Sequence, residues 1–230
     1  MAWQLHSLLF PSFTDTAAGL LRLLTMPVFW RALAISHQAL LLGYAAAAVV
    51  GVAIGFLMGR SPRADSWLDP FVVVLLITPM SALIPLVIIA LGIGLLARAL
   101  VVMLFAVVVI AVNVRAGVRA VDPGWLEMVR SFGATESQLW RAVLLPGALP
   151  AIVTGLRLGL GRAFAGMIAV ELLIASTGIG RLLLDFQGTF ESAAMFALTL
   201  VLVFEVTVLL HVLQLVERRI APQAMELAVE

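Results

Sequence analysis

The chain alternates long apolar stretches with short polar connections. Five stretches approach or exceed the length of about 20 apolar residues that a helix needs to cross a bilayer. They run over residues 39–58, 70–91, 96–114, 151–174 and 194–215. The pattern therefore predicts an all-α integral membrane protein with about five core transmembrane helices.

Residues 1–38 do not follow this pattern. Residues 17–30 are apolar but contain Arg22 and Pro27, and Arg31 follows them directly. Because this stretch is too short for a span, we expect an amphipathic interfacial helix, with Trp30 and Arg31 at headgroup depth. The alternative is a weak first span, which would be a sixth transmembrane helix. A signal peptide has a basic start followed closely by a cleavage site of small residues, and this segment lacks that pattern.

The first predicted span carries small residues at every fourth position: Gly43, Ala47, Gly51 and Gly55. Positions four apart lie on the same face of a helix, so a neighbouring helix can approach this face closely. We expect ordinary packing within the chain, and a dimer contact is the alternative.

Prolines mark the second predicted span. We expect Asp69 and Pro70 to start it, and Pro79 and Pro85 to bend it, because proline removes a backbone donor from a helix. A bend of this kind is tolerated where protein or a cavity covers it. Pro79 and Pro85 are therefore candidates for the wall of a translocation path, with a simple packing kink as the equal alternative.

The central segment, residues 115–147, interrupts the apolar pattern and must meet water. Asp122 followed by Pro123 predicts a helix start, and Thr135 with Gln138 forms a capping-box pattern. Gly133 lies between the two predicted helices, where glycine accepts the backbone conformation that ends a helix. We expect the second helix to end at Pro146.

Composition agrees with a membrane protein and narrows its chemistry. The chain is 63% hydrophobic and 12% charged, whereas soluble domains are about half apolar and about a quarter charged. It contains no cysteine and no lysine. This excludes a disulfide framework, a thiolate site, a Walker A phosphate loop and a Schiff-base lysine, and it argues against an enzyme. The net charge of +1, with arginines spread over loops, gives no surface for nucleic acid.

Arginine placement predicts the orientation in the membrane, because cytoplasmic loops carry excess positive charge. With five alternating spans, one side receives Arg60, Arg63, Arg115, Arg119, Arg130, Arg141, Arg218 and Arg219. The other side receives Arg98 and Arg181. We therefore expect segment 115–147 and the tail, residues 220–230, to be cytoplasmic, and residues 176–191 to form a short polar loop that faces outward.

Ionisable residues within a span are costly and are functional candidates by default. Arg162 and Glu171 lie in the fourth predicted span and could contribute to a translocation path for an anion. Structural roles are the favoured alternative: Arg157 could extend to the interface, and Arg162 could pair with Glu205 or Glu171. We expect no ligand cluster among the remaining polar residues of the spans, which are His37, Asn113, Glu205 and His211.

The central segment resembles a family motif. Glu127, Met128 and Val129 are followed after three residues by Gly133, and after nine more by Val143, Leu144, Leu145 and Pro146. This is similar to E-A-A-x3-G-x9-I-x-L-P, the motif of permease subunits of binding-protein-dependent ABC importers, with the two alanines replaced. The runs RSFGATESQLWRAVLLPGALPAIVTGLRLGLG, ITPMSALIPLVIIALGIG, VELL and STGIGRLL resemble the nitrate, sulfonate and taurine branch. The resemblance covers about residues 40–219.

The resemblance implies a type I ABC importer permease fold in the bacterial inner membrane. It implies two ATPase subunits that bind ATP and magnesium, a second copy of the permease, and a periplasmic or extracellular solute-binding protein, all surrounded by lipid. The permease itself would hold no cofactor and no metal. Its coupling residues would be Glu127, Met128, Val129, Gly133, Ala134, Val143, Leu145 and Pro146.

Within that set we expect Glu127 to make polar contact with the ATPase, Gly133 to form the turn, and Pro146 to join the segment to the fourth span. An ion-coupled secondary transporter or channel is the alternative function. It would use the membrane carboxylates of Glu171 and Glu205 and would need no ATPase.

Overall fold

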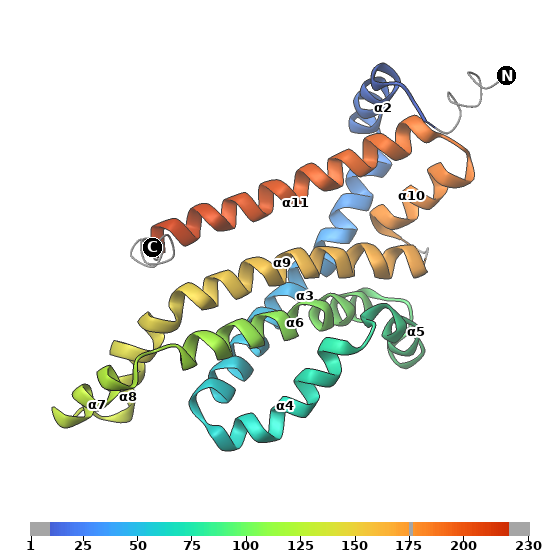
Figure 1. The fold of residues 1–230 in the computed structure, drawn as a ribbon. Coiled ribbons are helices and arrows are strands. Elements are labelled where there is room, and N and C mark those ends of the chain that lie inside the picture. The colour runs from blue at the N-terminus through green and yellow to red at the C-terminus, as the bar shows by residue number, and fades with distance from the viewer. Residues whose placement is uncertain (1–9, 175–176, 221–230) are drawn as a thin grey trace. The chain divides into compact units, whose positions relative to one another are not determined.

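The computed structural model describes residues 10–174 and 177–220. Over these ranges the chain folds into helices joined by short turns, and no strand occurs (Figure 1). The helices are α2 (Phe13–Thr25), α3 (Pro27–Arg60), α4 (Pro62–Ile77), α5 (Met80–Leu91), α6 (Leu95–Arg119), α7 (Pro123–Ser131), α8 (Glu136–Leu139), α9 (Leu145–Ile174), α10 (Gly178–Gly188) and α11 (Ser192–Ile220). A π-helical turn, η1 (Trp140–Leu144), joins α8 to α9. Residues 1–9 of the predicted N-terminal segment and residues 221–230 of the predicted tail lie outside the described residues.

Four of the helix boundaries lie at a residue that precedes proline. Met26, Ser61, Thr78 and Asp122 have ψ angles of 119°, 114°, 130° and 123°. The proline ring disfavours helical ψ at the residue before it, so the chain turns extended at these positions. Three of these prolines then open the next helix, where a missing N–H leaves no bond unmade.

The N-terminal region differs from its prediction. A capping box between Ser12 and Asp15 starts α2, which has 13 residues and is too short to span a bilayer. The predicted single helix over residues 17–30 is wrong, because Met26 breaks it and Trp30 lies in the first turns of α3. The indole Nε1 of Trp30 donates to the carbonyl oxygen of Leu24 at 2.9 Å, which secures this turn. The first long apolar helix begins at Pro27 rather than at residue 39.

The second predicted span is a pair of helices, α4 and α5, bent by 102°. The break lies at Thr78 and Pro79, as predicted for Pro79. The prediction that Asp69 and Pro70 start this span is wrong, because Ser61 caps α4 eight residues earlier and Pro70 lies inside the helix. Pro85 also lies inside a helix, α5, and does not end it.

Four helices of the described residues are long and apolar enough to cross a membrane, and the bent pair makes a fifth. The four are Pro27–Arg60, Leu95–Arg119, Glu136–Ile174 and Ser192–Leu215. The prediction of an all-helical membrane protein with about five core spans is therefore confirmed.

The long helices each contribute to two compact units. One unit contains Met1–Gly43, Ser81–Val102 and Phe164–Leu209, so it holds α2, α5, α10, the first parts of α3 and α6, the end of α9 and most of α11. The other contains Tyr44–Met80, Met103–Ala163 and Leu210–Glu230, so it holds α4, α7, α8 and the remaining parts of the long helices.

The small-residue face of α3 packs against α6 in both units. A Cβ atom on Gly43 would collide with the backbone of Ala99 in the first unit. In the second, a Cβ atom on Gly55 would lie 2.5 Å from the carbonyl oxygen of Ala111. Close approach of the two helix backbones therefore requires glycine, which confirms packing within the chain as the role of this face.

Residues 177–191 do not form the predicted polar loop, and Ser176 of that prediction lies outside the described residues. Most of the segment is helix α10, and five of its residues are buried: Gly178, Ile179, Gly180, Leu182 and Phe186. The apolar face of α10 explains the difference, since these side chains repeat at helical spacing on the side that packs.

Candidate functional site

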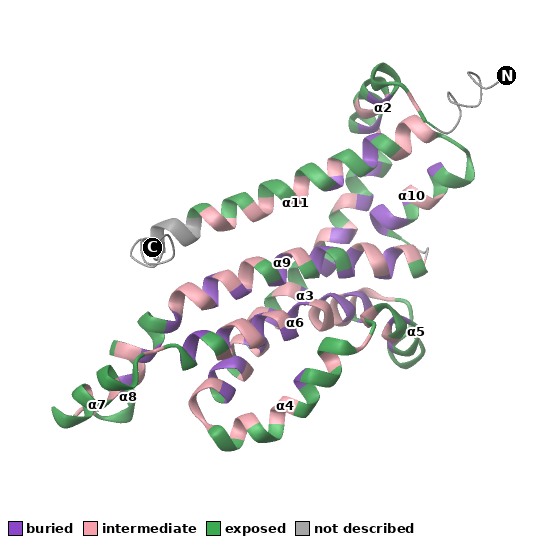
Figure 2. Ribbon diagram, in the orientation of Figure 1, coloured by how far each residue is buried: buried purple, intermediate pink, exposed green. Residues whose placement is uncertain are grey.

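The first whole helix of the central segment is α7, in which no residue is fully buried. Asp122 caps the helix, with its side chain accepting the backbone N–H of Gly124 at 2.7 Å, and Pro123 follows at the first position, as predicted. No residue of α7 is buried (Figure 2). Trp125 is 60% exposed and Met128 is 47% exposed, and Phe132, the residue that ends the helix, is 83% exposed. The segment therefore presents large apolar side chains to its surroundings.

The turn and second helix also match their predictions. Gly133 has a φ of +78°, which favours glycine, and its N–H donates to the carbonyl of Arg130 at 2.9 Å. The Thr135 hydroxyl accepts the backbone N–H of Gln138, and the Gln138 side chain accepts the N–H of Thr135 at 2.8 Å. This capping box starts α8.

The second helix does not end at Pro146, so that prediction is wrong. After α8 the chain makes the π-helical turn η1 and continues into α9, with Pro146 in the first turn of that helix. Proline is tolerated there, and Leu145 before it keeps a helical conformation with a ψ of −49°. The segment is thus joined to the fourth span by an unbroken run of helical backbone.

The predicted coupling residues lie on this segment without being buried, whereas Leu144 at the variable position of the motif is buried. Glu127 and Met128 are exposed on α7, and Val129 is half-buried beside them. Gly133 is exposed in the turn. The others are Ala134 and Val143, which are half-buried, and Leu145 and Pro146, which are exposed. They remain predicted coupling residues.

An ion pair ties α8 to the end of α3. Arg60 Nη2 lies 2.7 Å from Glu136 Oε2, and Arg130 of α7 lies 3.7 Å from the other carboxylate oxygen. The rings of Phe56 and Trp140 stack beside this pair, with centroids 5.5 Å apart. This contact could not be predicted from the sequence, because nothing in the spacing links residues so far apart in the chain.

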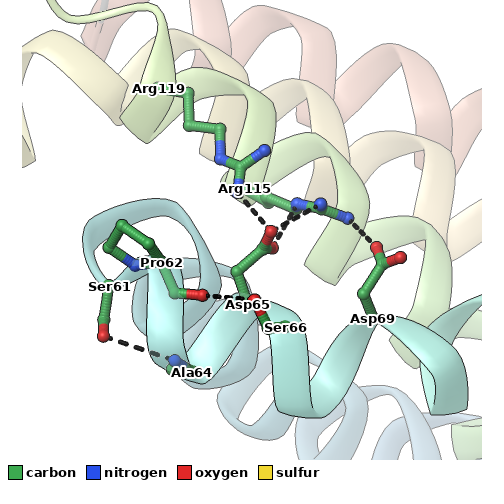
Figure 3. A network of polar contacts seen from close by, with 8 residues as sticks. All are labelled: Ser61, Pro62, Ala64, Asp65, Ser66, Asp69, Arg115 and Arg119. Atoms are coloured by element: carbon green, nitrogen blue, oxygen red, sulfur yellow. Dashed lines mark hydrogen bonds and ion pairs between the residues drawn. The ribbon is translucent and has the colours of Figure 1, made fainter.

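A second ionic cluster joins α4 to α6, as Figure 3 shows. Arg115 places Nε 2.8 Å from Asp65 Oδ1 and Nη2 3.0 Å from Asp65 Oδ2, and its Nη1 lies 2.5 Å from Asp69 Oδ1. Arg119 Nη2 lies 2.5 Å from Asp65 Oδ2. We call these four residues, Asp65, Asp69, Arg115 and Arg119, the α4–α6 clamp.

Glu171 lies in a buried polar cluster and is 1% exposed. Its carboxylate accepts the Ser36 hydroxyl at 2.8 Å and the backbone N–H of Gly180 at 3.0 Å, and Arg98 Nη1 lies 3.6 Å away. Ser36 in turn accepts the N–H of Ile179 at 2.9 Å. A Cβ atom on Gly180 would lie 2.5 Å from the Cβ of Glu171. The cluster therefore fixes the start of α10 against α3 and α9.

The predicted pairing of Arg162 with Glu205 or Glu171 is wrong. Glu171 pairs with Arg98, and Glu205 forms an ion pair with His37 Nε2. Arg162 is exposed and Arg157 is half-buried. Each observed partner comes from a different helix, so periodicity within one helix could not identify it.

The pair of His37 and Glu205 borders an apolar cavity of about 800 Å³. The cavity lies in the first unit among α2, α3 and α11, and Leu24, Trp30 and Phe204 contribute to its wall. Among the described residues no group of three potential metal ligands is close enough to hold an ion.

The predicted path residues Pro79, Pro85, Arg162 and Glu171 remain candidates, and each is described within its own unit. Pro79 is exposed at the break of the bent pair, and Pro85 is exposed inside α5. Glu171 is closed off by its hydrogen-bond partners, as described above. Pro79 and Arg162 belong to one compact unit, and Pro85 and Glu171 belong to the other.

A family model decides the identity of the chain. The model of the binding-protein-dependent transport system inner membrane component matches residues 47–224, which include the whole central segment. The chain belongs to this permease family. The match confirms the family inferred from the motif, and the permease is a multi-pass membrane protein.

Curated relatives agree with this assignment. The permease is 33% identical over 194 residues to the taurine transport system permease protein TauC of Escherichia coli, and the match covers 84% of this chain and 70% of the relative. It is 35% identical over 143 residues to the nitrate import permease protein NrtB of Synechocystis, with 62% of this chain and 52% of the relative covered. The match thus spans between about half and about 70% of the length of these two relatives.

Solved structures show the same fold. A chain of the MetNI methionine ABC transporter, in inward-facing conformations, superimposes with a TM-score of 0.64 at 23% identity, covering 83% of this permease and 93% of that chain. A chain of an amino acid ABC transporter gives a TM-score of 0.61 at 22% identity, with coverages of 84% and 94%. The permease therefore has the predicted type I ABC importer permease fold.

Proposed function

We propose that this permease forms the translocation path of an ATP-driven importer in the bacterial inner membrane. Two copies would assemble with two separate ATPase subunits, which bind ATP and magnesium, and with an external solute-binding protein. The chain itself would carry out no hydrolysis. The observation that carries the proposal is the exposed apolar side of α7, next to the family motif.

Three large side chains make this side of the segment. Trp125, Met128 and Phe132 follow each other at intervals of three and four residues, so they lie on one face of the helix. Exposed aromatic side chains that cluster on a polar loop are typical of a protein interface, where burial in a partner stabilises the complex. A partner with an apolar cleft, such as an ATPase subunit, fits this surface.

The connection of the segment to the membrane helices suits a mechanical role. The run from α8 through η1 to α9 is continuous helical backbone, and the ion pair of Arg60 and Glu136 adds a link to α3. Force applied to the segment would therefore reach both α3 and α9.

The proposed cargo is a small anionic or organic solute similar to nitrate, sulfonates or taurine. The support comes from the relatives, whose names state taurine and nitrate transport. Selection of the solute is assigned to the binding protein, and no residue of the chain is assigned to it.

The geometry argues against the ion-coupled alternative. Such a transporter needs a membrane carboxylate that can gain and lose an ion, yet Glu171 is enclosed by Ser36, Arg98 and the backbone of α10. Glu205 is paired with His37. Both carboxylates therefore already have partners within the chain.

Co-purification tests the proposal. The tagged chain is isolated from its native membrane, and accompanying proteins are identified by mass spectrometry. We expect an ATPase with a Walker A sequence in equimolar amount, which Met128→Asp together with Phe132→Asp removes. Trp67→Asp is the matched control, because Trp67 is an exposed tryptophan, 79% exposed, on α4. A chain that is purified intact but without an ATPase would contradict the proposal.

A further inference from the structure

We propose that the α4–α6 clamp is a permanent mechanical link, through which movement of the central segment reaches α4 during transport. The inference rests on the proposed function, because it assigns positioning residues within that cycle. It is carried by the geometry of the clamp, by its place in the chain and by the sparse packing of α4.

The clamp has a geometry that resists sliding and rotation. The guanidinium of Arg115 contacts both carboxylate oxygens of Asp65 and also reaches Asp69, one helical turn further along α4. Arg119, one turn further along α6, contacts Asp65 as well. Forked contacts of this kind fix orientation as well as distance. Because the contacts extend over two turns of α4 and two turns of α6, the two helices move together.

The clamp is also shielded from solvent more than an ordinary surface pair. This holds for its central pair, in which the side chains of Arg115 and Asp65 are 21% and 15% exposed, whereas the outer residues Asp69 and Arg119 are 41% and 45% exposed. Single exposed pairs contribute little to stability, but networks with forked geometry are the exception. By contrast, the side chains of Arg181 and Asp185 on α10 are 52% and 50% exposed.

Apolar packing within the chain holds α4 only weakly. Val72 is the one buried residue among the 16 residues of α4. Large side chains along the rest of the helix are exposed, including Trp67, Phe71 and Ile77. The clamp therefore supplies specific polar contacts between α4 and α6 where few side chains of α4 are buried.

The place of the clamp links it to the coupling segment. Arg119 is the last residue of α6, and Asp122 caps α7 only three residues later. Movement of α7 therefore acts on the end of α6 that carries both arginines. Through the clamp, this movement would pass to α4, the first helix of the bent pair.

The first test measures solute imported per ATP hydrolysed by the assembled transporter in proteoliposomes. Asp65→Asn keeps the size of the side chain and removes its charge. We expect ATP hydrolysis to persist while uptake per ATP falls between about twofold and about thirtyfold, the range of typical coupling energies. Asp185→Asn, in the exposed pair, is the control and should leave the ratio unchanged. An unchanged ratio in Asp65→Asn would overturn the inference.

A variant with milder effects covers the case in which Asp65→Asn does not assemble. Arg115→Lys keeps the positive charge but cannot make the paired hydrogen bonds of the planar guanidinium. We expect a smaller fall in uptake per ATP at normal amounts of assembled transporter. A loss of protein amount with an unchanged ratio would indicate a purely structural role and would refute the link.

Cross-linking decides whether the link is permanent. The chain contains no cysteine, so Asp65→Cys with Arg115→Cys introduces a single reactive pair. We expect a short bifunctional methanethiosulfonate to restore uptake in this double variant and to leave both single-cysteine variants unrestored. If the cross-link instead abolishes the remaining uptake, the contact must open during the cycle and the proposal fails.

The wild-type transporter separates this inference from the proposed function. If the wild-type assembly imports no solute with ATP, the proposed function fails before the clamp is tested. If it does import solute, the uptake per ATP hydrolysed in the variants tests the clamp alone.

Discussion

The carboxylate of Glu171 occupies the space that a side chain on Gly178 would need. Gly178 also has a φ of +85°, a conformation that residues with a Cβ rarely adopt. The two constraints act at the same position, the first residue of α10. Glycine is therefore required here both for the backbone conformation and for the buried cluster.

Replacement of Gly178 by alanine should destabilise the permease. The backbone strain alone is of order 1–3 kcal/mol, and displacement of the buried carboxylate adds to it. Gly188→Ala, at the other end of α10, is the control, because a Cβ there would meet nothing within 4 Å. Thermal unfolding in detergent should show a clearly lower midpoint for Gly178→Ala only. Equal midpoints would contradict the assigned packing.

Removal of Arg98 should expose the cost of a buried charge. The side chain of Glu171 is fully buried and that of Arg98 is 11% exposed, and loss of one partner of such a pair typically costs about 3–5 kcal/mol. We expect Arg98→Ala to reduce the yield of folded protein strongly. Arg98→Met combined with Glu171→Gln should recover much of it, since no unpaired charge remains. If both variants lose the same amount, the ion pair has no role in stability.

The effect of a substitution at Gly133 on uptake should depend on whether the new residue tolerates positive φ, rather than on its size. Asparagine tolerates positive φ, whereas valine, which is branched at Cβ, does not. Nothing lies within 4 Å of a Cβ at this position, so steric exclusion by neighbours is absent. We expect Gly133→Asn to keep most of the ATP-dependent uptake and Gly133→Val to abolish it, at equal expression. Similar uptake in the two variants would show that the turn is not required.

The small-residue face of α3 gives a prediction about assembly. A leucine at position 55 would force α3 away from α6, because even a Cβ atom lies 2.6 Å from the Cβ of Val114. Ala53→Leu, on the exposed side of the same helix, should be tolerated. Size-exclusion chromatography of the solubilised protein should show a monodisperse species for Ala53→Leu and little for Gly55→Leu. A monodisperse Gly55→Leu would place the close contact elsewhere.

Local signals in the sequence were sufficient for the central segment. The caps at Asp122 and Thr135 and the turn at Gly133 depend on residues within three positions of each other, so the chain itself specifies them. The same holds for the small face of α3, which recurs at the helical period. These features were predicted correctly because their physics is local.

Proline predicted helix boundaries less reliably than the capping and turn residues did. Pro79 lies where a helix ends, whereas Pro70 and Pro85 lie inside helices and Pro146 lies in the first turn of α9. The loss of one N–H can be tolerated when packing or tertiary contacts hold the helix on both sides. At Pro70, the neighbouring Asp69 is held by Arg115, which no local pattern reveals.

Pairings between helices could not be predicted. Glu171 and Arg98, or His37 and Glu205, lie far apart in the chain and share no periodicity. The sequence marks both carboxylates as candidates, but the alternative it suggests, Arg162 as a partner of Glu205 or Glu171, is not the pairing observed. Only the packing of the helices decides which arginine reaches which acid.

The π-helical turn at residues 140–144 makes the spacing of the motif determine the orientation of α8 about the axis of α9. A π turn holds one residue more than an α turn, and each residue turns a helix by about 100°. Deletion of one residue here could convert the turn to α-helix and rotate α8 about the axis of α9 without breaking either helix. The nine residues between Gly133 and Val143 thus set the rotational orientation of the segment about the axis of α9 as well as its distance from that helix. A permease one residue shorter would present Trp125 and Phe132 in a different direction.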